Sequence, residues 1–226
     1  MKNIIIVGAG ALGQELAWLI EEINDNNPEW NILGFLDDFA FDNKKSILGY
    51  PVLGRYDDYL SFMDSFFVVG FGDAVLREKI IRKMNSEELK WANLISPTVR
   101  VHRSNKIGKG VVIGRYTDLT VNCTIHDFVM LNIHVVLGHE VSVGQFSIIS
   151  PNVTVNGGGR IGKACQIGAN SFIRDIEVGD YSVVGASSCV IKNVDPESIV
   201  AGVPAKVLKV GRPNTSISRS EREDAQ

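Results

Sequence analysis

Residues 131–149 read LNIHVVLGHEVSVGQFSII, and within them an aliphatic residue returns at every sixth position. Continued in both directions, the series is Ile95, Val101, Ile107, Ile113, Leu119, Ile125, Leu131, Leu137, Val143, Ile149, Val155, Ile161, Ile167 and Ile173. After a slip of one residue it resumes at Val178, Val184 and Val190. If about one residue in three were aliphatic, chance would produce the unbroken series about once in several million trials. The period therefore predicts a repeat architecture.

Two further positions of the six-residue unit are biased. The residue after the aliphatic one is often glycine, as at Gly138 and Gly144, and the fifth is small or β-branched. Two inward residues per unit fit a short strand plus a corner, as in a parallel β-helix. We expect the glycines to allow corner conformations that cost other residues energy. Cys123 and Cys165 occupy the fifth position, which predicts buried core thiols rather than nucleophiles.

The composition excludes several classes of protein. The chain has 226 residues, of which 45% are apolar and 22% charged, as in an ordinary globular protein. Its net charge of −3 argues against nucleic acid or an anionic membrane as a partner. Three cysteines, odd in number and widely spaced, predict neither a disulfide framework nor a zinc site. No apolar run is as long as a membrane span requires, so we expect no membrane insertion and a cytoplasmic location.

The N-terminal part has a different pattern, in which an aliphatic run at 3–7 predicts a buried parallel strand. The glycine-rich stretch from Gly8 to Gly13 follows, and residues 14–23 have helical spacing. A glycine turn between a strand and a helix lets phosphates approach the backbone and the helix N-terminus. A structural glycine turn is the alternative interpretation.

Two more strands are expected at 32–36 and 66–70, with a turn-rich segment at 49–54 between them and a helix at 74–84. Asp37 and Asp38 follow the first of these strands, and Phe71 and Gly72 follow the second. Ligands of open parallel sheets bind at the carboxyl ends of strands, and an acid there can accept ribose hydroxyls. We predict a small βαβ, Rossmann-like domain over 1–92 that binds a mononucleotide-linked ligand, since it is short for NAD. Solvated aspartates are the alternative.

Four histidines are candidates for chemistry. His102 and His126 are expected to be exposed corner residues, and His134 to line a cleft or to be solvated. His139 stands beside Glu140, and Gly157 occupies the equivalent position three six-residue units further on, which is one full coil. We expect that glycine to leave room for a substrate above the imidazole.

These residues resemble the hexapeptide-repeat acyltransferases over about residues 95–209, ending in the terminal motif AGVPAK at 201–206. The resemblance implies a left-handed parallel β-helix over 93–210 and homotrimers with active sites between neighbouring helices. The whole chain looks like the nucleotide-sugar acetyltransferases of the bacillosamine and sialic-acid type. The matching residues include the glycine turn, Phe35 to Asp38, Gly72 with Arg77, the stretch at 93–97, Asn132, and Gly138 to Glu140. We expect 211–226 to be a polar, disordered tail.

The resemblance also implies roles for particular residues. His139 would be the general base, and Glu140 would tune it. The substrate-binding positions would be Gly10, Ala11, Leu12, Gly13, Asp37, Asp38, Phe71, Gly72 and Asn132. Ala169 and Ala186 would lie along the acetyl-CoA cleft, where several members have a second histidine that is replaced here by Ile148. No metal is expected.

The expected reaction is direct acetyl transfer from acetyl-CoA to the amine of a nucleotide-linked amino-deoxy-sugar. Histidine can take a proton at neutral pH, and a neighbouring carboxylate would fix its tautomer. One alternative is O-acetylation of a sialic acid or similar sugar, because the same base would serve a hydroxyl. A non-catalytic β-helix that acts as a scaffold or sensor is the other.

Overall fold

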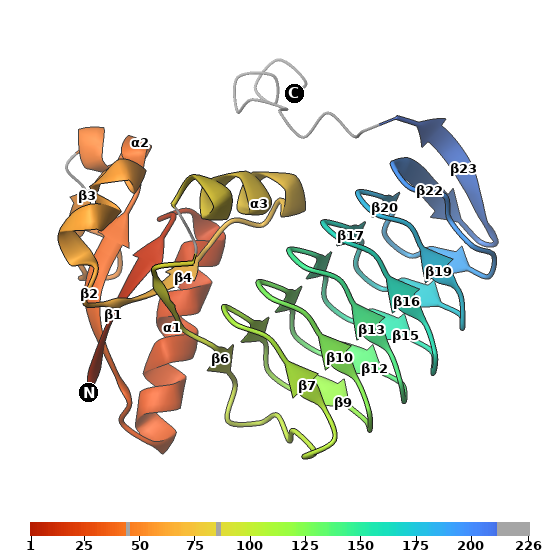
Figure 1. Cartoon of the computed structure of the whole chain (residues 1–226), viewed down its shortest axis with the longest axis horizontal. Helices are drawn as coiled ribbons and strands as arrows, with labels where there is room; N and C mark the ends of the chain where they lie inside the picture. The colour runs from red at the N-terminus through yellow and green to blue at the C-terminus, as the bar shows by residue number, and fades with distance from the viewer. Residues whose placement is uncertain (44–45, 85–86, 212–226) are drawn as a thin grey trace.

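The computed structural model describes residues 1–43, 46–84 and 87–211, which form an N-terminal sheet layer followed by a stack of coils (Figure 1). The polar tail expected at 211–226 lies outside the described residues apart from Gly211. Within the described ranges, no helix has the length and apolar composition needed to cross a membrane.

The N-terminal sheet has five strands in the order β3-β2-β1-β4-β5, all parallel. Its elements are β1 (Lys2–Val7), α1 (Ala11–Asn26), β2 (Trp30–Leu36), α2 (Asp38–Asp42), β3 (Val52–Gly54), the 3-10 helix η1 (Tyr56–Phe62), β4 (Phe66–Val69), α3 (Ala74–Lys83) and β5 (Lys90–Trp91). The predicted strands and both predicted helices are present, and α1 begins earlier than expected, at Ala11. The segment at 49–54 contains an edge strand, and α2 and η1 were not predicted because both are short and lack a clear period.

From residue 94 the chain forms coils of short strands. The strands are β6 (Leu94–Ile95), β7 (Lys106–Ile107), β8 (Val112–Ile113), β9 (Asp118–Leu119), β10 (Thr124–Ile125), β11 (Met130–Leu131), β12 (Val136–Leu137), β13 (Ser142–Val143), β14 (Ile148–Ile149), β15 (Thr154–Val155), β16 (Arg160–Ile161), β17 (Gln166–Ile167), β18 (Phe172–Ile173), β19 (Glu177–Val178), β20 (Val183–Val184) and β21 (Cys189–Val190). A hairpin of β22 (Ser198–Gly202) and β23 (Ala205–Val210) closes the stack.

The strands line up in three parallel sheets, one on each face of a prism, which confirms the left-handed β-helix. Thr124 pairs with Ser142 of the next coil, and the slip shortens one coil so that Arg160 pairs with Glu177. The second residue of each strand points inward, and these side chains form one continuous core. Val101 breaks the series, because it lies outside any strand and is 40% exposed.

The prediction of buried core thiols is confirmed for both cysteines that it named. Cys123 and Cys165 are fully buried, whereas Cys189 is half-buried on the outer side of β21. Burial raises the pKa of the Cys123 thiol and raises that of Cys165 to about 12. Both thiols therefore stay protonated at neutral pH and act as core side chains.

The glycines after each aliphatic residue have a different role from the one expected. A Cβ at Gly138 would lie 2.5 Å from the backbone nitrogen of Gly157 in the next coil, so the glycine permits close stacking. The left-handed backbone conformation falls at other, non-glycine positions of the corners, such as His134 and Glu140. Asn and Asp favour this conformation, but the hydrogen bonds between coils hold other residues in it as well.

One face of the prism is covered by the N-terminal layer. Val112, Met130 and Ile148 point outward from this face and pack in the core cluster that includes the N-terminal sheet. Helix α1 lies beside the first strand of the β-helix, β6 (Figure 1).

Arg77 of α3 joins the two parts. Its guanidinium is fully buried and donates to the carbonyl oxygens of Phe128 (2.8 Å), Val69 (2.5 Å) and Gly110 (3.5 Å). Val69 ends a strand of the sheet, whereas Gly110 and Phe128 lie at a corner of the β-helix. Burial lowers the pKa of Arg77 to about 10, so the side chain remains charged at neutral pH.

Candidate functional site

The glycines of the turn have two different roles: some allow close packing of the backbone, and others leave space beside it. A Cβ at Gly13 would collide with the carbonyl oxygen of Gly8, so this glycine allows α1 to pack against the sheet. Around Gly10 a Cβ would meet nothing within 4 Å, and at Gly72 only the Leu12 side chain, at 3.8 Å. Gly10 caps α1 without a side-chain hydrogen bond, and the first turn of the helix carries no acid. The backbone there is open to an anionic ligand.

The two aspartates after β2 differ from each other. Asp37 is buried, and its Oδ2 accepts hydrogen bonds from the Ala9 backbone nitrogen (2.9 Å) and the Tyr56 hydroxyl (3.1 Å). Its Oδ1 accepts from the Ala40 nitrogen (2.8 Å) and caps α2. The Asp37 carboxylate is therefore engaged by its own chain on both oxygens, which does not favour the expected contact with ribose.

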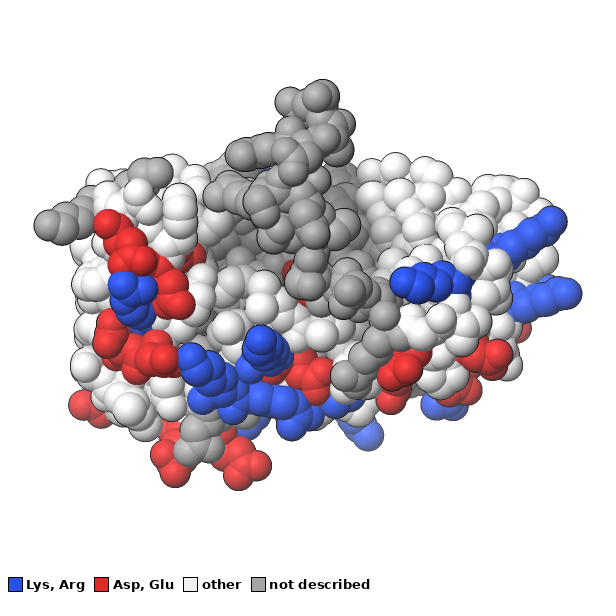
Figure 2. Space-filling model, turned by 90° about the horizontal axis from the view of Figure 1, so that it is seen from above, with Lys and Arg blue, Asp and Glu red and all other residues white. Residues whose placement is uncertain are grey.

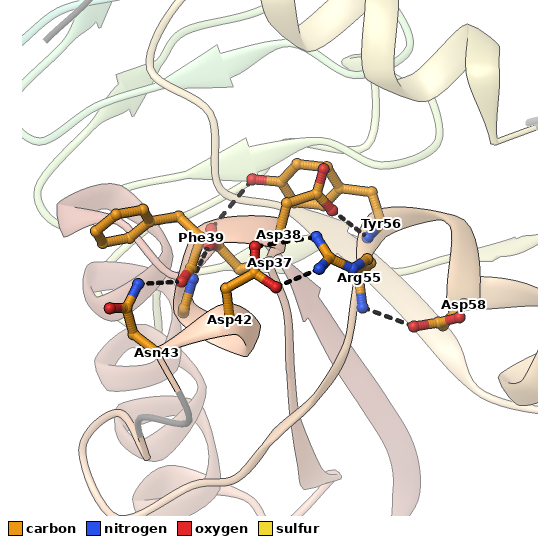
Figure 3. Close-up of polar contacts among 9 residues, drawn as sticks. Asp37, Asp38, Phe39, Asp42, Asn43, Arg55, Tyr56 and Asp58 are labelled. Atoms are coloured by element: carbon orange, nitrogen blue, oxygen red, sulfur yellow. Dashed lines mark hydrogen bonds and ion pairs between the residues drawn. The ribbon is translucent and has the colours of Figure 1, made fainter.

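Asp38 is exposed and accepts a hydrogen bond from the Tyr56 backbone nitrogen through Oδ1 (2.9 Å; Figure 3). Arg55 pairs with Asp42 across the same corner. Burial and the neighbouring Asp37 carboxylate raise the pKa of Tyr56. Phe71 packs edge-on against the Tyr56 ring, with centroids 5.5 Å apart, so Tyr56 links the two strand ends. Sequence reasoning missed Tyr56 because it lies in the unpredicted η1.

Acidic and basic side chains share this face of the molecule. Figure 2 shows acidic side chains over the N-terminal layer with a basic one among them, and both kinds interspersed along the β-helix.

His139 lies at a corner of the β-helix, on the far side of the strand β12 from Asn132. Its Nδ1 is 3.5 Å from Glu140 Oε2, and the two side chains are 67% and 65% exposed. The coils stack as expected, since the Gly158 nitrogen donates to the His139 carbonyl (2.8 Å). The space over Gly157 is occupied by the imidazole itself, because a Cβ there would lie 2.5 Å from His139 Nε2. That glycine makes room for the ring, whereas a substrate was expected in this space.

Of the other histidines, His102 and His126 are exposed at corners as predicted. His134 is also exposed, and its ring lies against that of Tyr116 in the previous coil, with centroids 5.1 Å apart.

A cleft of about 230 Å³ lies between α1 and the β-helix, and we name it the α1 cleft. Helix α1 contributes Leu12, Glu15 and Trp18, and the β-helix contributes Arg115, Asn132 and Ile133, among others. Leu12 belongs to the glycine turn, so the cleft joins a predicted phosphate site to the predicted substrate residue Asn132. The sequence offered no signal for Glu15, Trp18 or Arg115, because Arg115 is far along the chain from the other two.

Pro151 and Ala169 occupy the same corner position as Ile133 in the next two coils of the stack. The Asn152 nitrogen donates to the Ile133 carbonyl (3.2 Å), the Asn170 nitrogen to Pro151 (3.0 Å), and the Ser187 nitrogen to Ala169 (2.8 Å). Ala169 and Ala186 are thus adjacent positions of one column that starts at the α1 cleft. Ile148 is elsewhere: it is buried under the N-terminal layer and is not open to a coenzyme, contrary to its assignment.

No group of His, Cys, Asp and Glu side chains suited to a metal ion occurs in ranges 1–43, 46–84 and 87–211.

Comparisons with known proteins place the chain in a family. Residues 3–84 match the family model described as the PglD N-terminal domain. Galactoside O-acetyltransferase from Escherichia coli (strain K12) is 30% identical over 154 residues, which cover 59% of this chain and 68% of that protein. The chain spans less than half the length of the serine acetyltransferases it matches (46% for that of Buchnera aphidicola).

Among solved structures, the acetyltransferase domain of PglB from Neisseria gonorrhoeae FA1090 is 27% identical, with a TM-score of 0.82. The match covers 92% of this chain and all of that one. The same domain has been solved with acetyl coenzyme A. A variant of perosamine N-acetyltransferase from Caulobacter crescentus, solved with CoA and GDP-perosamine, shares the fold at 22% identity and a TM-score of 0.74, covering 92% of this chain and 98% of that one. The chain therefore belongs to the hexapeptide-repeat acetyltransferases, and its N-terminal part matches the PglD N-terminal domain.

Proposed function

We propose that this protein transfers the acetyl group of acetyl-CoA to an amine on a nucleotide-linked amino-deoxy-sugar, with His139 as general base. The observation that carries the proposal is the exposed His139–Glu140 pair, seated over Gly157. The structures of the PglB domain with acetyl-CoA and of perosamine N-acetyltransferase with CoA and GDP-perosamine support the choice of donor and acceptor.

The chemistry follows from the orientation of the imidazole. Glu140 faces Nδ1 and favours a proton there, which leaves Nε2 as the basic nitrogen. The neutral amine attacks the thioester carbonyl carbon, and Nε2 takes a proton from the nitrogen. Collapse of the tetrahedral intermediate breaks the carbon–sulfur bond, and the imidazolium returns the proton to the CoA thiolate. No acyl-enzyme is required.

The site needs a second copy of the chain to be complete. His139 and Asn132 lie at successive corners of one coil, with β12 between them, so one chain does not bring them together. The β12 face carries exposed apolar side chains, including Val136 (40%) and Phe172 (37%), which a neighbouring copy would cover. The trimer implied by the family resemblance would set His139 of one copy toward the α1 cleft and alanine column of the next.

The second candidate is O-acetylation of a sugar hydroxyl. The 30% identity with galactoside O-acetyltransferase favours it, and the same base would activate a hydroxyl.

Release of the CoA thiol from acetyl-CoA tests both candidates. The acceptors are UDP- and GDP-linked 4-amino-4,6-dideoxyhexoses, each beside its 4-hydroxy counterpart. Turnover with an amino-sugar alone supports the proposal. Turnover with the hydroxy-sugars alone establishes the second candidate, and full activity of His139→Ala with either acceptor overturns the mechanism.

A further inference from the structure

The α1 cleft has the size of part of a ligand. Its volume of about 230 Å³ equals that of about eight water molecules in the liquid. Pockets that enclose a whole drug-sized ligand start at about 300 Å³. The cleft therefore suits one sugar ring, while the nucleotide remains outside it.

The position of the cleft also suits a sugar ring. Leu12, which lines the cleft, closely follows the open backbone at Gly10, where a diphosphate would lie. Asn132 also lines the cleft and begins the corner whose column leads to Ala169. A sugar linked to a diphosphate at the glycine turn would thus extend toward the acetyl donor.

The charges in the cleft are unbalanced. Arg115 is neutralised by Glu22, with Nη1 and Oε1 3.1 Å apart, and its guanidinium lies 3.6 Å from the centroid of the Trp18 ring. Glu15 also lines the cleft. Its side chain is exposed, and in the part of the chain that the structure describes this side chain makes no hydrogen bond or ion pair. The cleft therefore has one uncompensated carboxylate among largely apolar walls.

We propose that the α1 cleft receives the sugar ring of the substrate and that Glu15 selects a sugar that carries an amino group. This inference rests on the proposed function and assigns the choice between amine and hydroxyl to a residue. An amino group on a sugar is cationic when protonated, so it offers Glu15 both a hydrogen bond and the attraction of opposite charges. A hydroxyl donates to the same carboxylate without carrying a charge, so its hydrogen bond lacks that attraction. Glu15 is a specificity residue that acts on binding. The bound ammonium releases one proton to solvent before attack, and His139 takes the second proton from the nitrogen during attack.

Glu15→Gln tests the assignment because it keeps the shape and removes the charge. With the 4-amino-sugar nucleotides, KM should rise about tenfold while kcat is not lowered, since a ground-state contact is lost. The 4-hydroxy counterparts lose no ion pair, so they should bind the variant at most about threefold more weakly than they bind the wild type. Asp25→Asn is the matched control, because it removes one negative charge from the same helix outside the cleft, and it should change neither value.

Ile133→Phe tests the location of the ring by filling the cleft from the β-helix side. It should weaken binding of the nucleotide-sugar, measured by calorimetry, at least tenfold more than binding of the parent UDP or GDP. Equal effects on both would overturn the placement of the sugar.

These experiments separate a failure of the proposed reaction from a failure of the Glu15 assignment. If wild-type protein binds the amino-sugar more tightly than the hydroxy-sugar, and Glu15→Gln removes the difference without any CoA release, the proposed reaction fails and this inference stands. If Glu15→Gln leaves the amine preference unchanged, or Asp25→Asn abolishes it equally, the inference fails whatever the reaction is. If neither sugar pair binds, both fail.

Discussion

The two parts of the molecule position their side chains by different means. In the β-helix, a residue's place follows from its number, because each coil repeats the one before it at a nearly constant spacing. In the N-terminal layer, place depends on individual contacts, as with Asp37, whose two oxygens bind Ala9, Ala40 and Tyr56. In the β-helix, the six-residue period is therefore enough to locate a side chain. In the N-terminal layer, the tertiary structure is needed.

The largest effect is expected for His139→Ala, which tests whether the residue located from the β-helix repeat is the general base. General-base catalysis contributes about 10² to 10⁴ in rate, so kcat should fall by that factor. Because the side chain is exposed, the midpoint of thermal unfolding should hardly move. His134→Ala is the control on the same coil and should retain most activity. Comparable losses in both variants would contradict the assignment of the base.

Arg77→Met tests the junction between the two parts. The substitution leaves three buried carbonyl oxygens without their donor, and each buried acceptor left unpaired costs about 1–3 kcal/mol, so the variant should lose about 3 kcal/mol or more. Denaturant titration should show that loss in the free energy of unfolding, with a separate transition for each part if they no longer unfold together. A cost below about 1 kcal/mol would show that apolar packing, rather than Arg77, joins them.

Gly157→Ala tests whether the stacking of coils positions the His139 ring, because a Cβ at residue 157 would lie 2.5 Å from His139 Nε2. The imidazole must turn away, and we expect kcat to fall about 10- to 100-fold while KM for acetyl-CoA changes little. Ser142→Ala, on an outer strand position, is the control. Normal turnover in Gly157→Ala would mean that the seated ring position is not the reactive one.

The pair Asp37→Asn and Asp38→Asn tests the N-terminal half. Asp37→Asn weakens the contacts of a buried carboxylate, and should cost about 1–3 kcal/mol in the free energy of unfolding. Asp38→Asn should cost under about 0.5 kcal/mol, since Asp38 is exposed, but should weaken nucleotide-sugar binding. The reverse order of the two stabilities would contradict the described roles.

The smallest effect is expected at Glu78, on the interface between α3 and the β-helix. Burial raises its pKa, but hydrogen bonds from Lys163 (2.6 Å) and Arg82 (2.8 Å) outweigh this, so the pKa is lowered from 4.5. The carboxylate thus stabilises the fold above pH 4.5, and this contribution disappears as the pH falls through the lowered pKa. In Glu78→Gln, the unfolding midpoint should vary less between pH 5 and pH 3 than in wild type.

The sequence predicted the β-helix almost completely, because one six-residue period accounts for the core from Ile107 to Val190. It failed at Val101, which keeps the spacing without lying in a strand. In the site, it located the His139–Glu140 pair but not the occupant of the space over Gly157, which depends on a rotamer. Glu15, Trp18 and Arg115 could not be grouped, because their proximity arises only when α1 packs on the β-helix.

The left-handed corner residues have an evolutionary consequence. Each coil is a self-contained module that begins and ends at the same backbone geometry, so duplication of one whole coil after Ile173 would lengthen the stack without disturbing its existing strands. The site around His139 would be unchanged, while the closing hairpin would move outward by one strand spacing, about 4.8 Å. The length of the β-helix can thus change in steps of one coil. Related proteins could therefore present a longer or shorter column of coils to a coenzyme while they keep the residues around His139 unchanged.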